Sequence, residues 1–152
     1  MLDLAALVGG QALFRGMSAH RLHALAACAQ SRMFAPGSWL LREGEAADAF
    51  FVLLRGHVVL ELVTPGRAAR SIATLGPGDV AGVSWVAPPY RWQFDARALE
   101  PTLVLAFDVA CLRATFAVDA ALGLDLMQRF AAMLAQRLQS ARLHMLDVYG
   151  DH

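Results

Sequence analysis

Two histidines, His20 and His23, lie three residues apart in a segment with a helical apolar pattern, so their imidazoles can share one helix face. A pair of this kind binds zinc when two further ligands complete a tetrahedral site. No third ligand is evident near the pair, and we interpret both residues as part of a solvated helix face. We therefore expect no metal site.

The other reactive side chains are also isolated. Ser84 has no histidine and aspartate near it that could form a hydrolase triad, so we predict that the chain is not an enzyme. Cys28 and Cys111 each lie in an apolar helical context, and we expect two buried free thiols rather than a disulfide. An iron–sulfur site requires a cluster of cysteines, which this sequence lacks.

Polar side chains alternate along a segment that we expect to be a strand, residues 92–98. With a period of two, Arg91, Gln93, Asp95 and Arg97 would share one face of that strand. Such a row is either an exposed salt-bridge stripe, which we favour, or the polar lining of a ligand site.

Glycines punctuate the chain between Gly37 and Asp108 and separate short apolar runs. Short runs at roughly 8–12-residue spacing with glycine turns predict an all-β sandwich or barrel. The expected strands are residues 39–41, 50–54, 58–63, 71–75, 92–98 and 102–107. Helices are expected at residues 2–8, 18–29, 109–115 and 119–149, with Ser18 as the N-cap of the second.

Two apolar stripes run along the last and longest expected helix. One stripe has the spacing of a heptad seam, which is typical of paired helices: Ala131, Leu134, Leu138, Ala141, Met145 and Val148. The other lies nearer the helix start and can pack on the β region: Leu122, Leu126, Phe130 and Met133. We predict a homodimer through this helix; the alternative is one wide core-facing stripe in a monomer.

Composition and charge limit the classes of partner that we expect this chain to bind. The chain is 57% hydrophobic and 17% charged, with a formal net charge of zero and no lysine. An uncharged chain lacks the field that binds phosphate backbones, so we expect no direct DNA binding by this chain. The first ten residues carry Asp3 and no basic residue, unlike a secretory signal, and no apolar run could span a membrane. We therefore expect a cytoplasmic protein without a membrane partner.

Five segments, taken in order, resemble the cyclic nucleotide-binding domain of the CRP/FNR regulator family. They are Leu13–Ser18, Phe34–Gly37, Glu43–Asp48, Phe51–Val58 and Gly78–Gly82. The resemblance implies a mainly β fold with flanking helices, a double-stranded β-helix or jelly roll followed by a long C-terminal helix. It implies one domain over residues 1–152, with the β-roll at about 31–108 and the dimerisation helix at about 119–149. Regulators of this family carry a helix-turn-helix after that helix, and this sequence ends at His152.

The family binds the nucleotide through a cassette with the pattern G-E-x-[GA], followed after a short loop by R-[ST]-A. Its glutamate accepts from the ribose hydroxyls, and its arginine pairs with the cyclic phosphate. We call residues 82–94 the cassette segment. Gly82 matches the glycine, but Val83 stands at the glutamate and Trp85 at the small residue.

The second half of the pattern is also replaced. Trp92, Gln93 and Phe94 stand at the arginine, the serine or threonine, and the alanine, while Arg91 lies one residue early. The nucleotide-binding residues therefore do not carry over, and we expect cyclic AMP to bind weakly or not at all. The candidate altered pocket comprises Gly82, Val83, Ser84, Trp85, Arg91, Trp92, Gln93 and Phe94. Its aromatic residues either fill the old pocket as core or line a changed one.

The sequence thus predicts a non-catalytic regulatory or sensory module with a degenerate nucleotide site. No cofactor is assigned, and a cyclic nucleotide or other small ligand is expected to bind weakly at most. The alternative is a ligand-free dimeric interaction scaffold.

Overall fold

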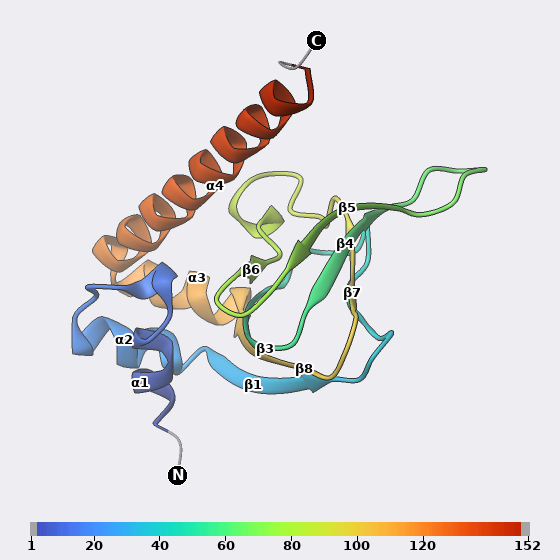
Figure 1. Ribbon diagram of the computed structural model, residues 1–152. Coiled ribbons are helices and arrows are strands. Elements are labelled where there is room, and N and C mark those ends of the chain that lie inside the picture. The colour runs from blue at the N-terminus through green and yellow to red at the C-terminus, as the bar shows by residue number, and fades with distance from the viewer. Residues whose placement is uncertain (1–2, 150–152) are drawn as a thin grey trace.

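The computed structural model describes residues 3–149 and contains two antiparallel sheets with helices gathered at one end (Figure 1). One sheet has the strand order β1 (Ala29–Phe34), β8 (Thr102–Asp108), β3 (Ala49–Arg55), β6 (Val80–Ala81). The other has the order β2 (Trp39–Leu41), β7 (Asp95–Ala98), β4 (Val58–Leu62), β5 (Arg70–Leu75). The predicted mainly β jelly roll with flanking helices is confirmed.

The core lies between the sheets and continues under the helices. In β3, Phe50 to Leu53 are each at most 3% exposed. Phe50 faces Phe107 of β8 across the ladder, and their rings stack at 4.6 Å. Phe14, from the 3-10 turn Ala12–Phe14, packs on Phe107 at 5.4 Å. Aromatic contacts therefore join the N-terminal segment to the β-roll.

Four α-helices flank the roll: α1 (Leu4–Gly9), α2 (Ala19–Ala26), α3 (Val109–Val118) and α4 (Ala120–Tyr149). The hydroxyl of Ser18 accepts a hydrogen bond from the Arg21 amide, as predicted for the N-cap of α2. Asp125 of α4 pairs with Arg21 at 3.0 Å and with Arg129 at 2.9 Å, which ties α4 to α2. None of the described helices is long and apolar enough to cross a bilayer.

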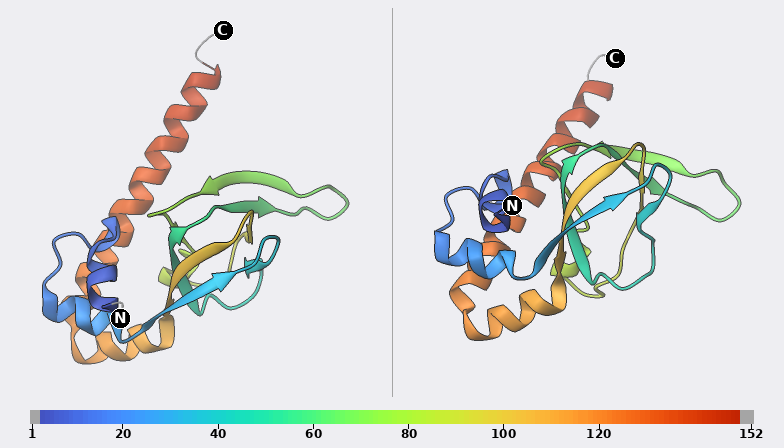
Figure 2. Two further views of the ribbon diagram at one scale, coloured as in Figure 1. Left: turned by 60° about the horizontal axis from the view of Figure 1, so that its bottom comes forward. Right: turned by 90° about the horizontal axis from the view of Figure 1, so that it is seen from below.

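α4 begins against the core and then leaves it. Leu122, Leu126 and Phe130 are at most 1% exposed and Met133 is half-buried, so the stripe predicted to pack on the β region does so. Beyond them the helix leaves the core, although Arg137 still reaches the Val80 carbonyl of β6, and its last turns project outward (Figure 2). Leu138 is 66% exposed there.

The predicted strand 92–98 is wrong in its first half, because β7 begins only at Asp95. The preceding residues are held as a loop by backbone bonds to the segment 44–47: the Gly44 amide donates to Trp92 O, and the Trp92 amide donates to Glu45 O. Backbone pairing with another loop thus overrides the alternation of side chains.

The predicted polar row therefore does not form. Asp95 is 5% exposed and accepts from the Glu43 amide at 2.7 Å, with Arg42 at 3.6 Å. Arg97 instead pairs with Glu61 on the neighbouring strand at 2.8 Å. These two groups are satisfied by separate partners and do not form one exposed stripe.

The prediction of two free thiols is also wrong. Cys28 and Cys111 form a disulfide, with their Cα atoms 5.5 Å apart. They are separated by 83 residues, and pairing of β1 with β8 brings the two chain segments together. The apolar context of each cysteine carries no information about that approach.

Candidate functional site

The cassette segment begins where β6 ends against β3. Ala81 pairs with Phe51, and Gly82 then turns the chain with φ +91°, a conformation that favours glycine. A short 3-10 turn, Ser84–Val86, follows directly. A glycine at a turn followed by a short helical turn is the arrangement expected for the predicted cassette, and Val83 and Trp85 occupy the positions where the family pattern has a glutamate and a small residue.

The Trp92 indole covers Gly82. A β-carbon at position 82 would lie 2.9 Å from Trp92 Cζ3 and 3.4 Å from the Ala49 carbonyl oxygen. Trp92 is 5% exposed, so nearly all of its ring is buried. Trp92 stands at the position where the family pattern has the phosphate-binding arginine, and in the structure its apolar ring lies against the cassette glycine.

Trp85 belongs to the aromatic core. Its ring is fully buried, stacks on Phe50 at 5.4 Å and meets Phe130 of α4 edge-on at 5.1 Å. Among the described residues, its indole Nε1 has no hydrogen-bond partner. Its backbone carbonyl accepts from Arg113 at 2.8 Å. Trp85 therefore joins the cassette segment, the first sheet and α4 in one packed unit.

The remaining predicted site residues lie nearer the surface. Val83 and Ser84 are half-buried, whereas Arg91, Gln93 and Phe94 are exposed. The Arg91 guanidinium donates to the Gly44 carbonyl at 2.9 Å. The structure thus buries Trp85 and Trp92, leaves Gly82 half-buried beneath the Trp92 ring, and keeps the polar candidates nearer the surface.

Arg137 of α4 was missed by the sequence prediction. Its guanidinium donates to the carbonyl of Val80, two residues before Gly82. Burial lowers the pKa of Arg137, and the nearby Asp79 carboxylate opposes that change. The position of α4 is therefore linked directly to the entry of the cassette segment. The one sequence signal for Arg137 is its position next to Leu138, a residue of the predicted heptad seam.

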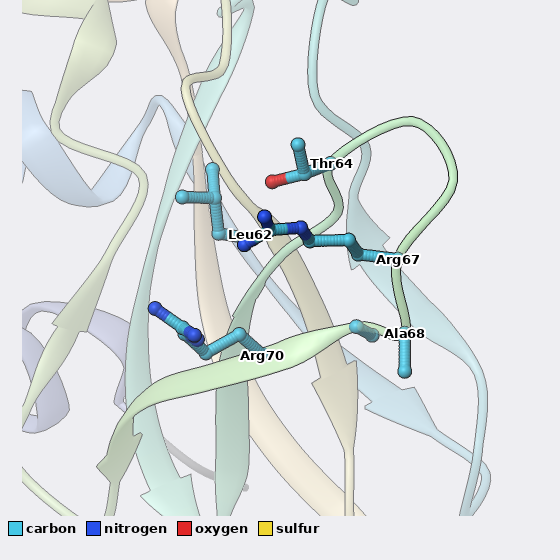
Figure 3. Close-up of a pocket in the computed structure, with 6 residues that line it drawn as sticks. Leu62, Thr64, Arg67, Ala68 and Arg70 are labelled. Carbon is cyan, nitrogen blue, oxygen red and sulfur yellow. The ribbon is translucent and has the colours of Figure 1, made fainter.

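Two surface hollows lie elsewhere. One of about 380 Å³ sits at the β4–β5 hairpin and is lined by Leu62, Thr64, Arg67, Ala68, Ala69 and Arg70 (Figure 3). The other, of about 440 Å³, opens beside the disulfide and includes Arg32, Asp48 and Asp108. Neither hollow is lined by a residue of the cassette segment.

The predicted dimer residues that are described remain accessible. Leu138 and Ala141 are exposed, and Leu134 is half-buried. Leu124, which is 61% exposed and two heptads before Leu138, extends the same stripe toward the start of α4. The side chains of Met145 and Val148 lie outside the described residues.

The two histidines considered as metal ligands are not joined by further ligands in the described part of the chain. His20 and His23 are both exposed on α2. No group of three or more histidine, cysteine, aspartate or glutamate side chains that could hold a metal occurs among the residues described.

Comparisons with known proteins identify a matching family and several relatives of this chain. The family described as the cyclic nucleotide-binding domain matches residues 31–119, more than half of the chain. The HTH-type transcriptional regulator Cmr of Mycobacterium tuberculosis is 28% identical over 141 residues, which cover 90% of this chain and 55% of that protein. The chain thus spans about half the length of this relative.

Solved structures share the fold. The Thermus thermophilus catabolite activator protein superposes with a TM-score of 0.71 at 26% identity, covering 91% of this chain and 62% of that one. A cyclic nucleotide-binding domain from Methylobacillus flagellatus has a TM-score of 0.80 at 22% identity, covering 95% and 81%. The second likeness supports the fold alone.

Proposed function

The chain belongs to the cyclic nucleotide-binding domain family, and from this premise we propose that it is a non-catalytic regulatory module with a degenerate nucleotide site. The observation that carries the proposal is the packing of Trp92 on Gly82, where a β-carbon would already be too close to the ring. An apolar ring occupies the place where the family pattern has an arginine. Cyclic AMP therefore binds weakly or not at all.

The chemistry of the missing partners points the same way. A charge-assisted hydrogen bond contributes about 1.5–3 kcal/mol. Val83 cannot accept from a ribose hydroxyl, and Trp92 cannot pair with a phosphate. Losing two such bonds lowers affinity by about 10²–10⁴-fold. Arg91, which donates to the Gly44 carbonyl, does not replace them in this structure.

The module acts as one domain over residues 1–152, with the β-roll at about 31–108 and a dimerisation helix at about 119–149. Dimerisation is supported by the exposed Leu124 and Leu138 on one stripe of α4. We place the protein in the cytoplasm and assign it no DNA contact of its own. The Arg137–Val80 contact gives α4 a direct link to the cassette segment.

A second candidate is a ligand-free dimeric scaffold. It is favoured by the burial of both tryptophans of the cassette segment, because Trp85 is fully buried and Trp92 is 5% exposed. In this case the aromatic residues stabilise the roll and the dimer presents a fixed surface to a partner.

Calorimetry with cyclic AMP and cyclic GMP tests the proposal. The unmodified protein is compared with the double variant Val83→Glu/Trp92→Arg, which restores both polar partners. Thr74→Arg serves as the control for an added arginine, since Thr74 is exposed on β5 and lies outside the cassette segment. Circular dichroism checks that each variant is folded.

Weak or no binding by the unmodified protein, with a gain in the double variant but not in the control, supports a degenerate site. Binding at micromolar affinity or tighter by the unmodified protein would contradict it, and Arg91→Ala would then show whether Arg91 holds the phosphate. A folded double variant that binds neither nucleotide favours the scaffold.

A further inference from the structure

The Cys28–Cys111 disulfide lies at the surface end of the first sheet, away from the cassette segment. Cys28 immediately precedes β1, and Cys111 is the third residue of α3. Both cysteines line the hollow of about 440 Å³ described above. A disulfide on the wall of an open hollow is accessible to small thiols in a way that a core disulfide is not.

From this placement we infer that the Cys28–Cys111 pair is a reversible thiol–disulfide exchange site, which a small dithiol reductant opens by attacking Cys111. This inference is independent of the nucleotide site. The two sulfurs differ in access, because Cys28 is 6% exposed whereas Cys111 is half-buried. Attack therefore occurs at Cys111 Sγ.

The first step is a displacement at sulfur. A thiolate of the reductant forms a bond to Cys111 Sγ as the Cys28–Cys111 bond breaks, and the electron pair of that bond leaves on Cys28 Sγ. The Thr115 hydroxyl lies 3.7 Å from Cys28 Sγ and donates to the Cys111 carbonyl at 2.9 Å. Its hydrogen can rotate toward the new thiolate, which makes Cys28 a better leaving group. The thiolate then takes a proton from solvent.

The second step releases Cys111. The other thiolate of the reductant attacks its own sulfur in the mixed disulfide, and the electron pair leaves on Cys111 Sγ. Cys111 lies in the first turn of a ten-residue helix, where the helix dipole stabilises an anion. Two electrons have passed from the dithiol, which becomes a disulfide, to the cysteine pair.

Backbone contacts hold the two segments together without the sulfur bond. The Asp108 amide donates to the Cys28 carbonyl at 2.9 Å, and β1 pairs with β8 from Ala29 opposite Phe107 to Phe34 opposite Thr102. The reduced cysteines therefore stay close, and the disulfide can form again in the folded protein. Reversibility without unfolding is the property that separates this site from a purely structural crosslink.

The test uses the full chain in its oxidised form, without denaturant. The protein is treated with dithiothreitol, alkylated at intervals and mapped by peptide mass spectrometry. In a parallel sample, 2-mercaptoethanol traps the mixed disulfide. We expect both cysteines to be alkylated in the native protein, the trapped thiol to lie on Cys111, and oxidised glutathione to restore the disulfide after dithiothreitol is removed.

Two threonine variants test the leaving-group role. Thr115→Val removes the hydroxyl beside Cys28 and should slow native reduction several-fold. Thr74→Val, on an exposed position of β5, is the matched control and should leave the rate unchanged. Equal rates for Thr115→Val and the control would overturn the role of Thr115.

Any of three results would overturn the exchange site itself: the oxidised protein is found to contain no Cys28–Cys111 disulfide, the disulfide is reduced only after urea is added, or the trapped thiol maps to Cys28. None of these results bears on nucleotide affinity, so failure here is distinct from failure of the proposed function.

Discussion

The Trp92 ring lies directly over Gly82, and a β-carbon added to the glycine would come 2.9 Å from Trp92 Cζ3. Because Gly82 has no side chain, the Trp92 indole can pack directly on its backbone. The family pattern has an arginine at the position of this tryptophan. The same backbone that could present amide groups to a phosphate thus supports an apolar contact. The proposal of a degenerate nucleotide site rests on this contact.

Gly82→Ala should destabilise the protein through both this contact and the backbone. Gly82 and Gly78 share a φ of +91°, but a β-carbon at Gly78 meets nothing within 4 Å. Gly78→Ala therefore reports the backbone strain alone, about 1–3 kcal/mol. Gly82→Ala should cost about 1–3 kcal/mol more because the indole must shift. Urea unfolding measures both free energies, and equal losses would contradict the proposed contact.

Phe130→Ala should remove the aromatic link between α4 and the cassette segment. Phe130 is 1% exposed and packs edge-on against Trp85 and Phe50. Truncation of a buried phenylalanine costs about 3–5 kcal/mol of unfolding free energy. Phe94→Ala, at a residue that is 37% exposed, should cost less than about 1 kcal/mol. A similar loss in both variants would contradict the central role of the cluster.

Leu138→Glu should convert a dimer into monomers. Leu138 is 66% exposed in the single chain, and pairing of two α4 helices would bury it, so a carboxylate there would be buried without a partner. Gln136→Glu adds the same charge on the opposite side of the helix and should leave the dimer intact. Light scattering across a concentration series gives the mass of each. A monomeric unmodified protein at high concentration would refute the paired helix.

Asp125 should make stability dependent on pH in the acidic range. The Arg129 hydrogen bond, and then the Arg21 bond, hold the pKa of this carboxyl below its ordinary value of 3.8 despite some desolvation. A lowered pKa means that the carboxylate stabilises the fold above about pH 4 and that this contribution is lost as the pH falls through the folded-state pKa.

The comparison is between the unmodified protein and Asp125→Asn in urea at pH 7 and near pH 3. The variant should lose about 0.5–1 kcal/mol at pH 7, as expected for a partly exposed ion-pair network. The difference should shrink at the lower pH, because the unfolded chain takes up the proton there before the native carboxyl does. A deficit that is the same at both pH values would show that the loss is not electrostatic.

Local features of the fold could be predicted from the sequence. Ser18 caps α2 because a hydroxyl at that position satisfies a free helix amide, and this requires only neighbouring residues. The spacing of Leu122, Leu126 and Phe130 likewise predicts the buried stripe of α4, since a helix places such residues on one face. The proposed loss of nucleotide binding rests on the residue types at Val83 and Trp92 and stays a prediction.

Contacts between distant segments were decided by the tertiary structure. The Cys28–Cys111 bond joins residues 83 apart, and the Arg137–Val80 bond joins residues 57 apart. Asp95 is buried because the loop before β7 pairs with another loop and delivers the Glu43 amide to it. Sequence periodicity determines which face of an element is apolar. Which partner packs against that face depends on sheet register and helix docking. These determine the distances between residues far apart in the sequence, and a local pattern carries no information about such distances.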